Sequence, residues 1–313
     1  MKRYETALAS VGILFLVFVS THAEGEAPEP RLALLARPDA KEVAPYEPLR
    51  VTVALRNVSV EQVKVDGSFL PTLQLTCRRA DGSSTITVPG SMWGHYMGGT
   101  RDLAPGQEIT SPERLFVFRK RGRHHFVFGE PGEYHVKVGA LLGGRERIES
   151  EPVKVLVKPL PPDHASAAKL VTEVKAARML QRWGYKEGTA ALLEKLVSEF
   201  PHCLYADHVN YILGEYHSGK HLAVVEDNIP AARRGFRYYS AVSARIGAMR
   251  ARALIRMAEL VLGTPQAKLT DDPGELLREL KGYGGVAEAV GLGRNWRRSC
   301  TKLQALLAPP KKP

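Results

Sequence analysis

Two histidines in the second half of the chain have a spacing that could bind a metal ion. His217 and His221 are four positions apart, and Glu215 comes two positions earlier. Residues four apart lie on the same face of an α-helix, and imidazole and carboxylate groups are common ligands of zinc. However, Gly219 interrupts the segment and weakens a helix there. The pattern therefore favours a solvated helix end over a metal site.

A second group of soft ligands surrounds Trp93. The thioethers of Met92 and Met97 and the imidazole of His95 are suitable ligands for Cu(I). Methionines beside an aromatic residue more often belong to a packed loop, because the thioether fills irregular gaps between apolar side chains. We therefore predict a loop here and no copper site.

We find no sequence motif of catalysis. Residues 90–94 read Gly-Ser-Met-Trp-Gly, in which the serine directly follows the first glycine and cannot occupy the apex of a nucleophile elbow. The glycine-rich segment 282–293 has neither the lysine nor the preceding apolar strand of a phosphate-binding loop. The sequence therefore predicts no catalytic residue, no cofactor and no metal.

Basic residues form three groups in this chain of 313 residues, whose formal net charge is +11. The first group lies between two Phe-containing segments, which indicates a hairpin loop, and contains Arg119, Lys120, Arg121 and Arg123. The second is expected on one helix face and contains Arg245, Arg252 and Arg256. The third contains Arg294, Arg297 and Arg298. Solvated surfaces explain such groups without a partner, and the alternative is a surface for a polyanion or an acidic protein.

The first residues read as an export signal. Met1-Lys2-Arg3 is basic, residues 6–20 are mostly apolar, and Thr21-His22-Ala23 is a small-x-small cleavage site. The apolar run is shorter than the ~20 residues that cross a bilayer. We expect a mature, periplasmic or extracellular chain that begins near Glu24, with an uncleaved anchor as the alternative. Cleavage removes two basic residues and one acidic residue, which lowers the net charge to +10.

Export changes the partners that this charge suggests. For an exported protein we expect no nucleic acid, and instead envelope polymers, acidic proteins or anionic lipid head groups. Cys77, Cys203 and Cys300 are too few for a disulfide framework, so the predicted cores must fold without one. A single bridge, for example between Cys203 and Cys300, stays open because sequence does not fix their distance.

Residues 32–157 have the texture of an all-β unit. Leu49–Leu55 alternates apolar and polar residues, which predicts a half-buried strand. Further short strands are expected at residues 63–65, 73–77, 85–88, 115–118, 126–128, 134–138 and 153–157. Turn dipeptides such as Asp81-Gly82 and Pro131-Gly132 separate them. Frequent short strands of this kind indicate an antiparallel sandwich.

Three patterns in this unit resemble bacterial immunoglobulin-like or fibronectin-like modules. They are residues 51–59 as a strand with an Asn-x-Ser end, residues 103–107, and residues 131–138 as a turn into a closing strand. The resemblance covers residues 32–158. It implies an immunoglobulin-like β-sandwich and no particular ligand, since the disulfide and strand tryptophan of antibody domains are absent.

A proline-rich linker at residues 159–163 separates the β unit from a helical one. Three prolines between Lys158 and Pro162 exclude a helix, and Asp163 then has the place of an N-cap. Two apolar stripes with a helical period follow, the first at Leu170, Val174, Ala177 and Leu180, the second at Leu193, Leu196, Val197 and Phe200.

The segment from Phe200 resembles the tetratricopeptide repeats of exported bacterial proteins. Phe200-Pro201 ends one helix, Tyr205-Ala206-Asp207 opens the next, and Gly214 would let a neighbouring helix approach closely. A fainter copy at residues 232–236 and 253–260 follows at an offset of 44 residues. The resemblance covers residues 165–263, and it implies stacked helix pairs with a concave groove for a segment of another protein.

The last part of the chain is predicted from weaker patterns. Residues 274–280 are one expected helix, residues 283–293 a flexible glycine-rich linker, and residues 295–308 a last amphipathic helix. The side chains expected to point inward from that last helix are Trp296, Leu303, Leu306 and Leu307.

Together the patterns predict a multi-domain β + α protein, an immunoglobulin-like sandwich followed by tetratricopeptide-like repeats. The expected units are a signal peptide at 1–23, a disordered leader at 24–31, the sandwich at 32–158, the linker at 159–163, helical repeats at 164–263, a helical extension at 264–308 and a disordered tail at 309–313. No transmembrane segment is expected after signal cleavage.

These units lead us to expect a non-enzymatic binding or scaffolding protein of the bacterial envelope. The groove residues expected to contact a protein partner are Asn210, Tyr211, His217, Arg252 and Arg256, with the basic loop Arg119–Arg123 as an accessory. One alternative is an accessory or catalytic protein that acts on envelope polysaccharide. The other is a binder of envelope polyanions through basic patches.

Overall fold

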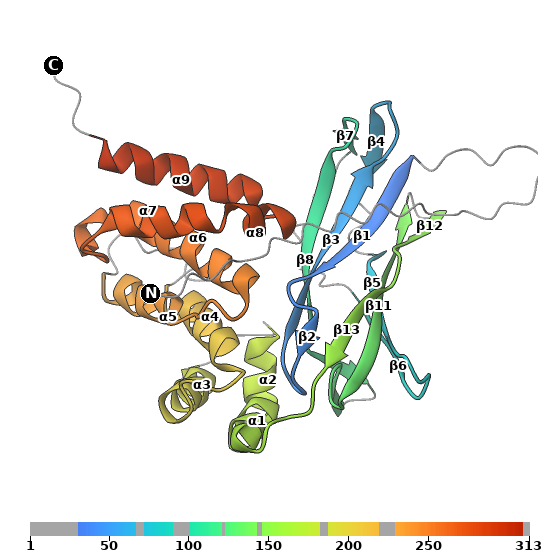
Figure 1. The fold of residues 1–313 in the computed structure, drawn as a ribbon, viewed down its shortest axis with the longest axis horizontal. Helices are drawn as coiled ribbons and strands as arrows, with labels where there is room; N and C mark the ends of the chain where they lie inside the picture. The colour runs from blue at the N-terminus through green and yellow to red at the C-terminus, as the bar shows by residue number, and fades with distance from the viewer. Residues whose placement is uncertain are drawn as a thin grey trace, which may run out of the picture.

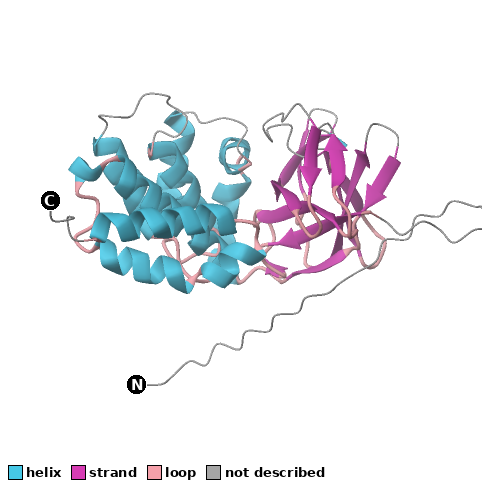
Figure 2. Ribbon diagram, turned by 90° about the horizontal axis from the view of Figure 1, so that it is seen from above, coloured by secondary structure: helices cyan, strands magenta, loops and turns pink. Residues whose placement is uncertain are grey.

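The computed structural model describes residues 31–66, 72–89, 100–120, 123–142, 146–181, 187–218 and 229–308. A β half, residues 31–157, and a helical half, residues 162–308, lie side by side (Figures 1 and 2). The predicted order of a β part followed by a helical part is therefore confirmed. The expected export signal, the loop around Trp93, Arg121, His221 and the tail from residue 309 lie outside the described residues.

The β half contains short strands joined by tight turns. Its strands are β1 (Leu32–Pro38), β2 (Glu42–Val43), β3 (Leu49–Asn57), β4 (Val63–Asp66), β5 (Gln74–Arg79), β6 (Thr85–Pro89), β7 (Thr100–Leu103), β8 (Glu108–Leu115), β9 (Val117–Lys120), β10 (Arg123–Phe126), β11 (Gly132–Leu142), β12 (Glu146–Glu149) and β13 (Val153–Val157). All eight predicted strands overlap one of these, although the strand predicted at 126–128 shares only Phe126 with β10. Strands β1, β2, β7, β8 and β12 lacked a clear alternating pattern and were not predicted individually.

Two sheets enclose the core of the β half. In the first, β3 is central and pairs antiparallel with β1 and β8. In the second, the strand order is β2-β13-β11-β5-β6, and β12 pairs with β11. Side chains from both sheets, among them Val51, Val53, Val136 and Val155, form one buried cluster. Removal of this apolar surface from water holds the two sheets together.

Strand β3 is buried on both faces, although its alternation predicted a half-buried strand. The side chains that face the core are the expected ones, Leu49, Val51, Val53 and Leu55. On the other face, Arg50, Thr52 and Ala54 have only 6%, 2% and 0% of their surface exposed. The helical half covers this face, and the Thr52 hydroxyl donates to the carbonyl of Val290 (3.0 Å). The alternation of one strand carries no information about a second domain that covers it.

The helical half begins after a 3-10 turn at Pro162–His164. Its helices are α1 (Ala165–Thr172), α2 (Val174–Leu180), α3 (Glu187–Glu199), α4 (Ala206–His217), α5 (Ile229–Ser240), α6 (Gly247–Gly263), α7 (Pro273–Gly282), α8 (Gly284–Ala289) and α9 (Gly293–Leu307). The N-cap of α1 is His164, without a side-chain capping bond, so the cap expected at Asp163 is wrong. Pro162 begins the 3-10 turn, which includes Asp163 and moves the start of the α-helix to Ala165.

The first predicted apolar stripe is divided between two helices. Glu173 has φ −58° and ψ 134°, which breaks the helix between α1 and α2. As a result Val174 is 52% exposed, whereas Ala177 and Leu180 are buried as expected. The break comes from the extended backbone of Glu173 alone. The spacing of the apolar residues in the sequence continues across Glu173, so it gives no sign of the break.

Helices α3 to α6 stack pairwise, and the expected break at Phe200-Pro201 lies between α3 and α4. A Cβ added at Gly214 would lie 2.6 Å from the ring of Tyr239 on α5, so the expected close approach of a neighbouring helix is confirmed. This packing is compatible in general shape with helical repeats.

The C-terminal part differs from its prediction in two places. The expected flexible linker at residues 283–293 contains α8 and the start of α9. Gly284 allows the close approach of the Trp296 ring, which would lie 2.7 Å from a Cβ added there, and Gly291 supplies a φ of +73°. Trp296 and Leu303 point inward as predicted. Leu306 and Leu307 do not, since they are 49% and 44% exposed in the last turn of α9.

The three cysteines are free and buried, so Cys203 and Cys300 form no bridge in this structure. Burial raises the pKa of the Cys77 thiol to about 12, which keeps it protonated and unreactive. In the part of the chain that the structure describes, none of the helices combines the length and the apolar character needed to traverse a bilayer.

Candidate functional site

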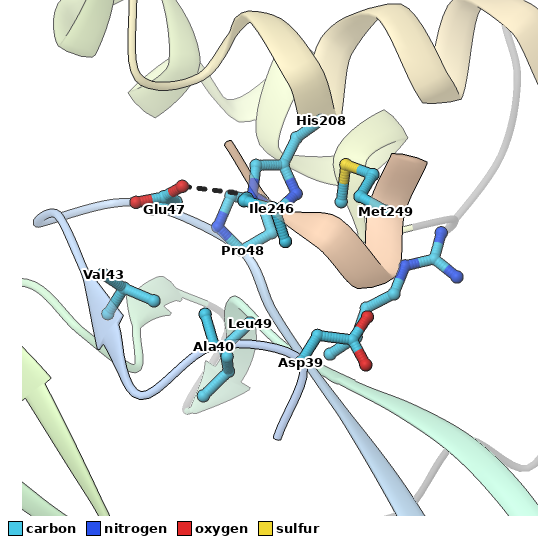
Figure 3. Close-up of a pocket in the computed structure, with 10 residues that line it drawn as sticks. Asp39, Ala40, Val43, Glu47, Pro48, Leu49, His208, Ile246 and Met249 are labelled. Carbon is cyan, nitrogen blue, oxygen red and sulfur yellow. Dashed lines mark hydrogen bonds and ion pairs between the residues drawn. The ribbon is translucent and has the colours of Figure 1, made fainter. Parts of the chain in front are cut away.

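The two halves meet along a buried surface that we call the interdomain seam. It is formed by residues 39–52 of the β half and by the facing parts of α4, α6 and the α5–α6 connection (Figure 3). Phe116 and Val117 of the β half belong to the same apolar cluster as the helical core. The side-chain amide of Gln181 accepts from the N–H of Val117 (3.2 Å) and donates to the carbonyl of Arg114 (3.1 Å). Apolar and polar contacts therefore both join the halves.

A buried carboxylate, Glu47, connects the β half to two parts of the helical half. It accepts hydrogen bonds from the N–H of Ala44 (2.8 Å), from Nε2 of His208 on α4 (3.3 Å) and from the guanidinium of Arg245 in the α5–α6 connection (2.7 Å). The guanidinium of Arg245 also lies 3.4 Å from the carboxylate of Asp207. Only 2% of the Glu47 surface is exposed, so water cannot replace these partners.

The surroundings of Glu47 keep it ionised. Burial by itself would raise the pKa of Glu47, but the hydrogen bond from His208 and the charge of Arg245 outweigh burial and lower it. Burial lowers the pKa of His208, the hydrogen bond and charge of Glu47 oppose burial without cancelling it, and the positive charges of Arg245 and Arg114 lower the pKa further. At neutral pH the pair is therefore a neutral imidazole that donates to a carboxylate.

Two of the expected groove residues lie inside the seam. Arg252 on α6 forms two hydrogen bonds with the carboxylate of Asp39 (3.2 and 3.3 Å), and these side chains are 6% and 3% exposed. Tyr211 on α4 is 3% exposed, with the guanidinium carbon of Arg50 4.7 Å from its ring centroid. Asn210 is buried as well, at 6%. The β half of the same chain therefore covers Tyr211 and Arg252, where we had expected a groove open to another protein.

A small void lies within the seam, between Asp39 and Glu47 on one side and His208 and Met249 on the other (Figure 3). Its volume is about 10 Å³, which is about the room of one water molecule. Small-molecule sites occupy several hundred Å³. This void therefore suits a structural water and not a substrate.

A second cluster lies at the surface of the helical half, where α3, α4 and α5 meet. We call it the His217 cluster, and its members are Glu194, His217, Arg234, Arg237 and Tyr238. Nε2 of His217 lies 2.7 Å from the carboxylate of Glu194, and the Tyr238 hydroxyl donates to the same oxygen (3.2 Å). The His217 and Tyr238 rings stack, with centroids 5.2 Å apart and planes 13° apart. The Arg237 guanidinium carbon lies 5.5 Å from the Tyr238 centroid.

These contacts hold His217 in place as part of a layered surface. Burial lowers the pKa of His217, and the nearby Arg234 and Arg237 lower it further, while Glu194 opposes them. Among the residues that the structure describes, no group of three or more His, Cys, Asp and Glu side chains could hold a metal ion. His221, the other histidine of the predicted pair, lies outside those residues. Within them, the partner of His217 is the carboxylate of Glu194.

The other predicted basic residues have varied surroundings. Arg256 on α6 pairs with Glu259 (2.5 Å). Burial alone would lower the pKa of Arg256, but Tyr211, Glu259 and Glu215 raise it above its ordinary value. Arg245 was expected on the same helix face and lies before α6, which begins at Gly247, so that expectation is wrong.

The expected basic hairpin is present in the backbone. Strands β9 and β10 pair antiparallel, with Lys120 opposite Arg123 and Arg119 opposite His124. Arg121 and the side chains of Arg119, Lys120 and Arg123 lie outside what the structure describes.

Sequence reasoning missed the acidic partners in both clusters. Asp39 and Glu47 at the seam, and Glu194 with Tyr238 at the surface, were not among the candidates. One signal could have found the first two. They are acidic residues of the β half, opposite in charge to Arg245 and Arg252 of the helical half, and such complementarity favours contact between two units.

Comparisons with known proteins do not assign this chain to a family. No protein-family model and no curated protein sequence matches it. Among solved structures, the sporulation control protein Spo0M from Bacillus subtilis is 14% identical over 50% of this chain and 57% of that chain, with a TM-score of 0.26. The alkylpurine DNA glycosylase AlkC from Pseudomonas fluorescens is 11% identical over 42% of this chain and 31% of that chain, with a TM-score of 0.25.

A β-glucosidase from Listeria innocua is 20% identical over 41% of this chain and 16% of that chain, with a TM-score of 0.23. This chain thus covers less than two thirds of each of the three proteins. At these scores the matches establish neither a common fold nor a common activity.

Proposed function

We propose that this protein is exported and acts as a non-enzymatic binding or scaffolding protein, which engages a protein partner through its helical half. The sequence patterns support the finer assignments within this proposal, an immunoglobulin-like β half and tetratricopeptide-like helices. Export rests on the basic, apolar and small-x-small order of residues 1–23.

The helical half already binds a polypeptide segment, which is one reason for the proposal. Residues 39–50 of the β half contact it through an ion pair at Asp39, a carboxylate at Glu47 and the carbonyl of Pro45, which accepts a hydrogen bond from Tyr205 (2.8 Å). Stacked helix pairs commonly bind extended segments in this way. Because this surface is occupied within the chain, a separate partner must use another face of the helical half.

The observation that carries the proposal is the layered arrangement of the His217 cluster. Tyrosine and arginine are enriched among the residues that dominate protein interfaces. Here Glu194 holds the side chains of His217 and Tyr238 in one conformation through hydrogen bonds. Because these side chains are already ordered, a partner that binds them loses less free energy to side-chain conformational entropy. Arg234 and Arg237 are exposed beside the stacked rings. This surface fits a partner that offers carboxylates around an apolar or aromatic side chain.

The test is cross-linking of the tagged full-length protein in cells of its own host, followed by mass spectrometry of the linked species. We expect one or a few discrete protein partners. The variant Arg234→Glu with Arg237→Glu should reduce their recovery at least tenfold, because it reverses the charge beside the rings. The matched control is Lys169→Glu with Lys175→Glu, which makes the same charge change at exposed positions of α1 and α2.

Equal recovery with both variants would contradict a role for the His217 cluster, and an absence of discrete partners would contradict the binding function. Export has its own readout, the N-terminal sequence of the protein recovered from cells. We expect it to begin near Glu24. A chain that keeps residues 1–23 and remains in the cytosol would contradict export.

A further inference from the structure

The last helix, α9, has two faces of opposite character. Its buried face contains Ser299, Cys300 and Leu303, and the indole N–H of Trp296 donates to the carbonyl of Leu280 on α7 (2.7 Å). The opposite face is exposed along the whole helix. The buried contacts fix the orientation of α9, so the exposed face is presented in a defined direction.

The exposed face of α9 is cationic. We call it the α9 strip and define it by Arg294, Arg298 and Lys302, which are four positions apart in sequence and therefore share one side of the helix. No Asp or Glu occurs between Gly293 and Leu307. The neighbouring Arg297 pairs with Glu288 (2.7 Å). Within the described part of the chain, none of the three strip residues forms an ion pair with a carboxylate, so their charges are available to a ligand.

Two exposed leucines follow the strip in the last turn of α9. Leu306 is 49% exposed and Leu307 44%, and they are among the few large apolar side chains exposed in the described residues. Single exposed apolar residues are common on protein surfaces. Here, however, two adjacent leucines directly follow a row of cations. In such an arrangement the cations can contact the anionic head groups of a lipid surface, and the leucines can enter the boundary between head groups and acyl chains.

We propose that the α9 strip with Leu306 and Leu307 docks on an anionic lipid bilayer surface. The cations contact the lipid phosphates, and the leucines enter the boundary between head groups and acyl chains. Each Lys or Arg near an anionic surface strengthens binding several-fold, and the contribution is screened by salt. This interaction is independent of the protein partner proposed above, because it uses a different face of the helical half.

A soluble anionic polymer would satisfy the same three cations. It offers no apolar layer, so Leu306 and Leu307 would contribute nothing to its binding. The adjacency of the leucines to the strip therefore favours a bilayer, and the two ligands give different results when the leucines are replaced.

The test uses the purified mature chain in co-sedimentation with vesicles, which requires no protein partner. Vesicles of phosphatidylcholine with about one third phosphatidylglycerol should bind the protein, whereas pure phosphatidylcholine should not. Raising the salt from about 0.1 M to about 0.5 M should weaken binding at least tenfold, because added ions screen the strip.

Two variants separate the contributions. Arg294→Gln with Arg298→Gln and Lys302→Gln should lower the partition coefficient roughly 100-fold, from several-fold for each cation. Leu306→Ser with Leu307→Ser should lower it at least tenfold through lost apolar burial. The matched control is Lys169→Gln with Lys175→Gln and Arg178→Gln, which removes three exposed charges from α1 and α2 and should change binding less than threefold. All changed positions are exposed, and unchanged thermal unfolding verifies the fold.

Several results would overturn the proposal. These are absence of binding to the anionic vesicles, equal loss with the control variant, or loss with the charge variant but not with the leucine variant. The last result, together with competition by inorganic polyphosphate, would instead identify a soluble polyanion as the ligand.

Discussion

At the scale of single residues, the ion pair between Arg252 and Asp39 shows how much depends on burial. Arg252→Met should lower the free energy of unfolding by about 3 kcal/mol, because it leaves the Asp39 carboxylate buried without its cation. Adding Asp39→Leu should restore most of that loss, since two apolar side chains can replace a buried ion pair. Urea denaturation of the two variants and the parent chain measures both effects.

An exposed ion pair supplies the control. Arg297 and Glu288 are 62% and 55% exposed, so Glu288→Gln should change the free energy of unfolding by less than about 1 kcal/mol. If Arg252→Met were equally mild, the seam would be open to water, contrary to the burial described above.

The imidazole of His208 should make stability depend on pH. Its pKa is lowered in the folded protein, so the folded state keeps it neutral, whereas an unfolded histidine binds a proton below about pH 6.5. Stability from this residue is therefore complete above that pH and is lost as the pH falls through the lowered value. Glu47, whose pKa is also lowered, adds a further loss below about pH 4.3.

Chemical denaturation at a series of pH values checks this expectation. His208→Gln, whose amide can still donate to Glu47, should remove most of the decrease between pH 7.5 and pH 5.5. The comparison is His217→Gln, which alters a histidine that is less buried and should remove less of the decrease. A His208→Gln protein with the pH dependence of the parent chain would mean that His208 binds protons equally in the folded and unfolded states, contrary to the lowered pKa.

At the scale of elements, the sequence predicted what local patterns encode. The alternation of Leu49–Leu55 identified β3, and the Phe200-Pro201 break separated α3 from α4. The patterns failed where a single backbone conformation decides the element. Glu173 divides one apolar stripe into two helices, and Gly284 and Gly291 support close helix packing instead of a flexible linker. Such conformations depend on neighbours that are distant in sequence.

Gly214 is an element-scale position whose role was predicted and can be tested. Gly214→Ala should destabilise the protein by about 1–3 kcal/mol, because the added methyl would overlap the buried Tyr239 ring between α4 and α5. In contrast, Gly188→Ala in α3 meets no atom within 4 Å and should stabilise by up to about 1 kcal/mol through helix propensity. Thermal unfolding of both variants measures the difference. Equal effects would mean that α4 and α5 can separate without cost.

At the scale of the whole molecule, the seam explains why the candidate site could be predicted only in part. Tyr211 and Arg252 were chosen because a helical groove was expected to face solvent, and their polar and aromatic character fits that role. The β half instead covers them through Arg50 and Asp39. Domain docking depends on complementarity between two surfaces, and a pattern within either half does not reveal it. His217 lies away from the seam and is only partly buried, with 10% of its side chain exposed.

The shared core of the halves should make them unfold together. Phe116 and Val117 belong to the helical cluster, and the buried pairs at Glu47 and Arg252 cross the seam. Separation would expose these groups, so we expect a single transition in which β-sheet and helix signals coincide. Native-state hydrogen exchange should give β3 and α6 the same opening free energy.

Asp39→Arg, which places like charges together in the seam, should lower that shared value and split the transition in two. Two separate transitions in the parent chain, with β3 and α6 opening independently, would show that the halves are stable apart and that the seam contributes little.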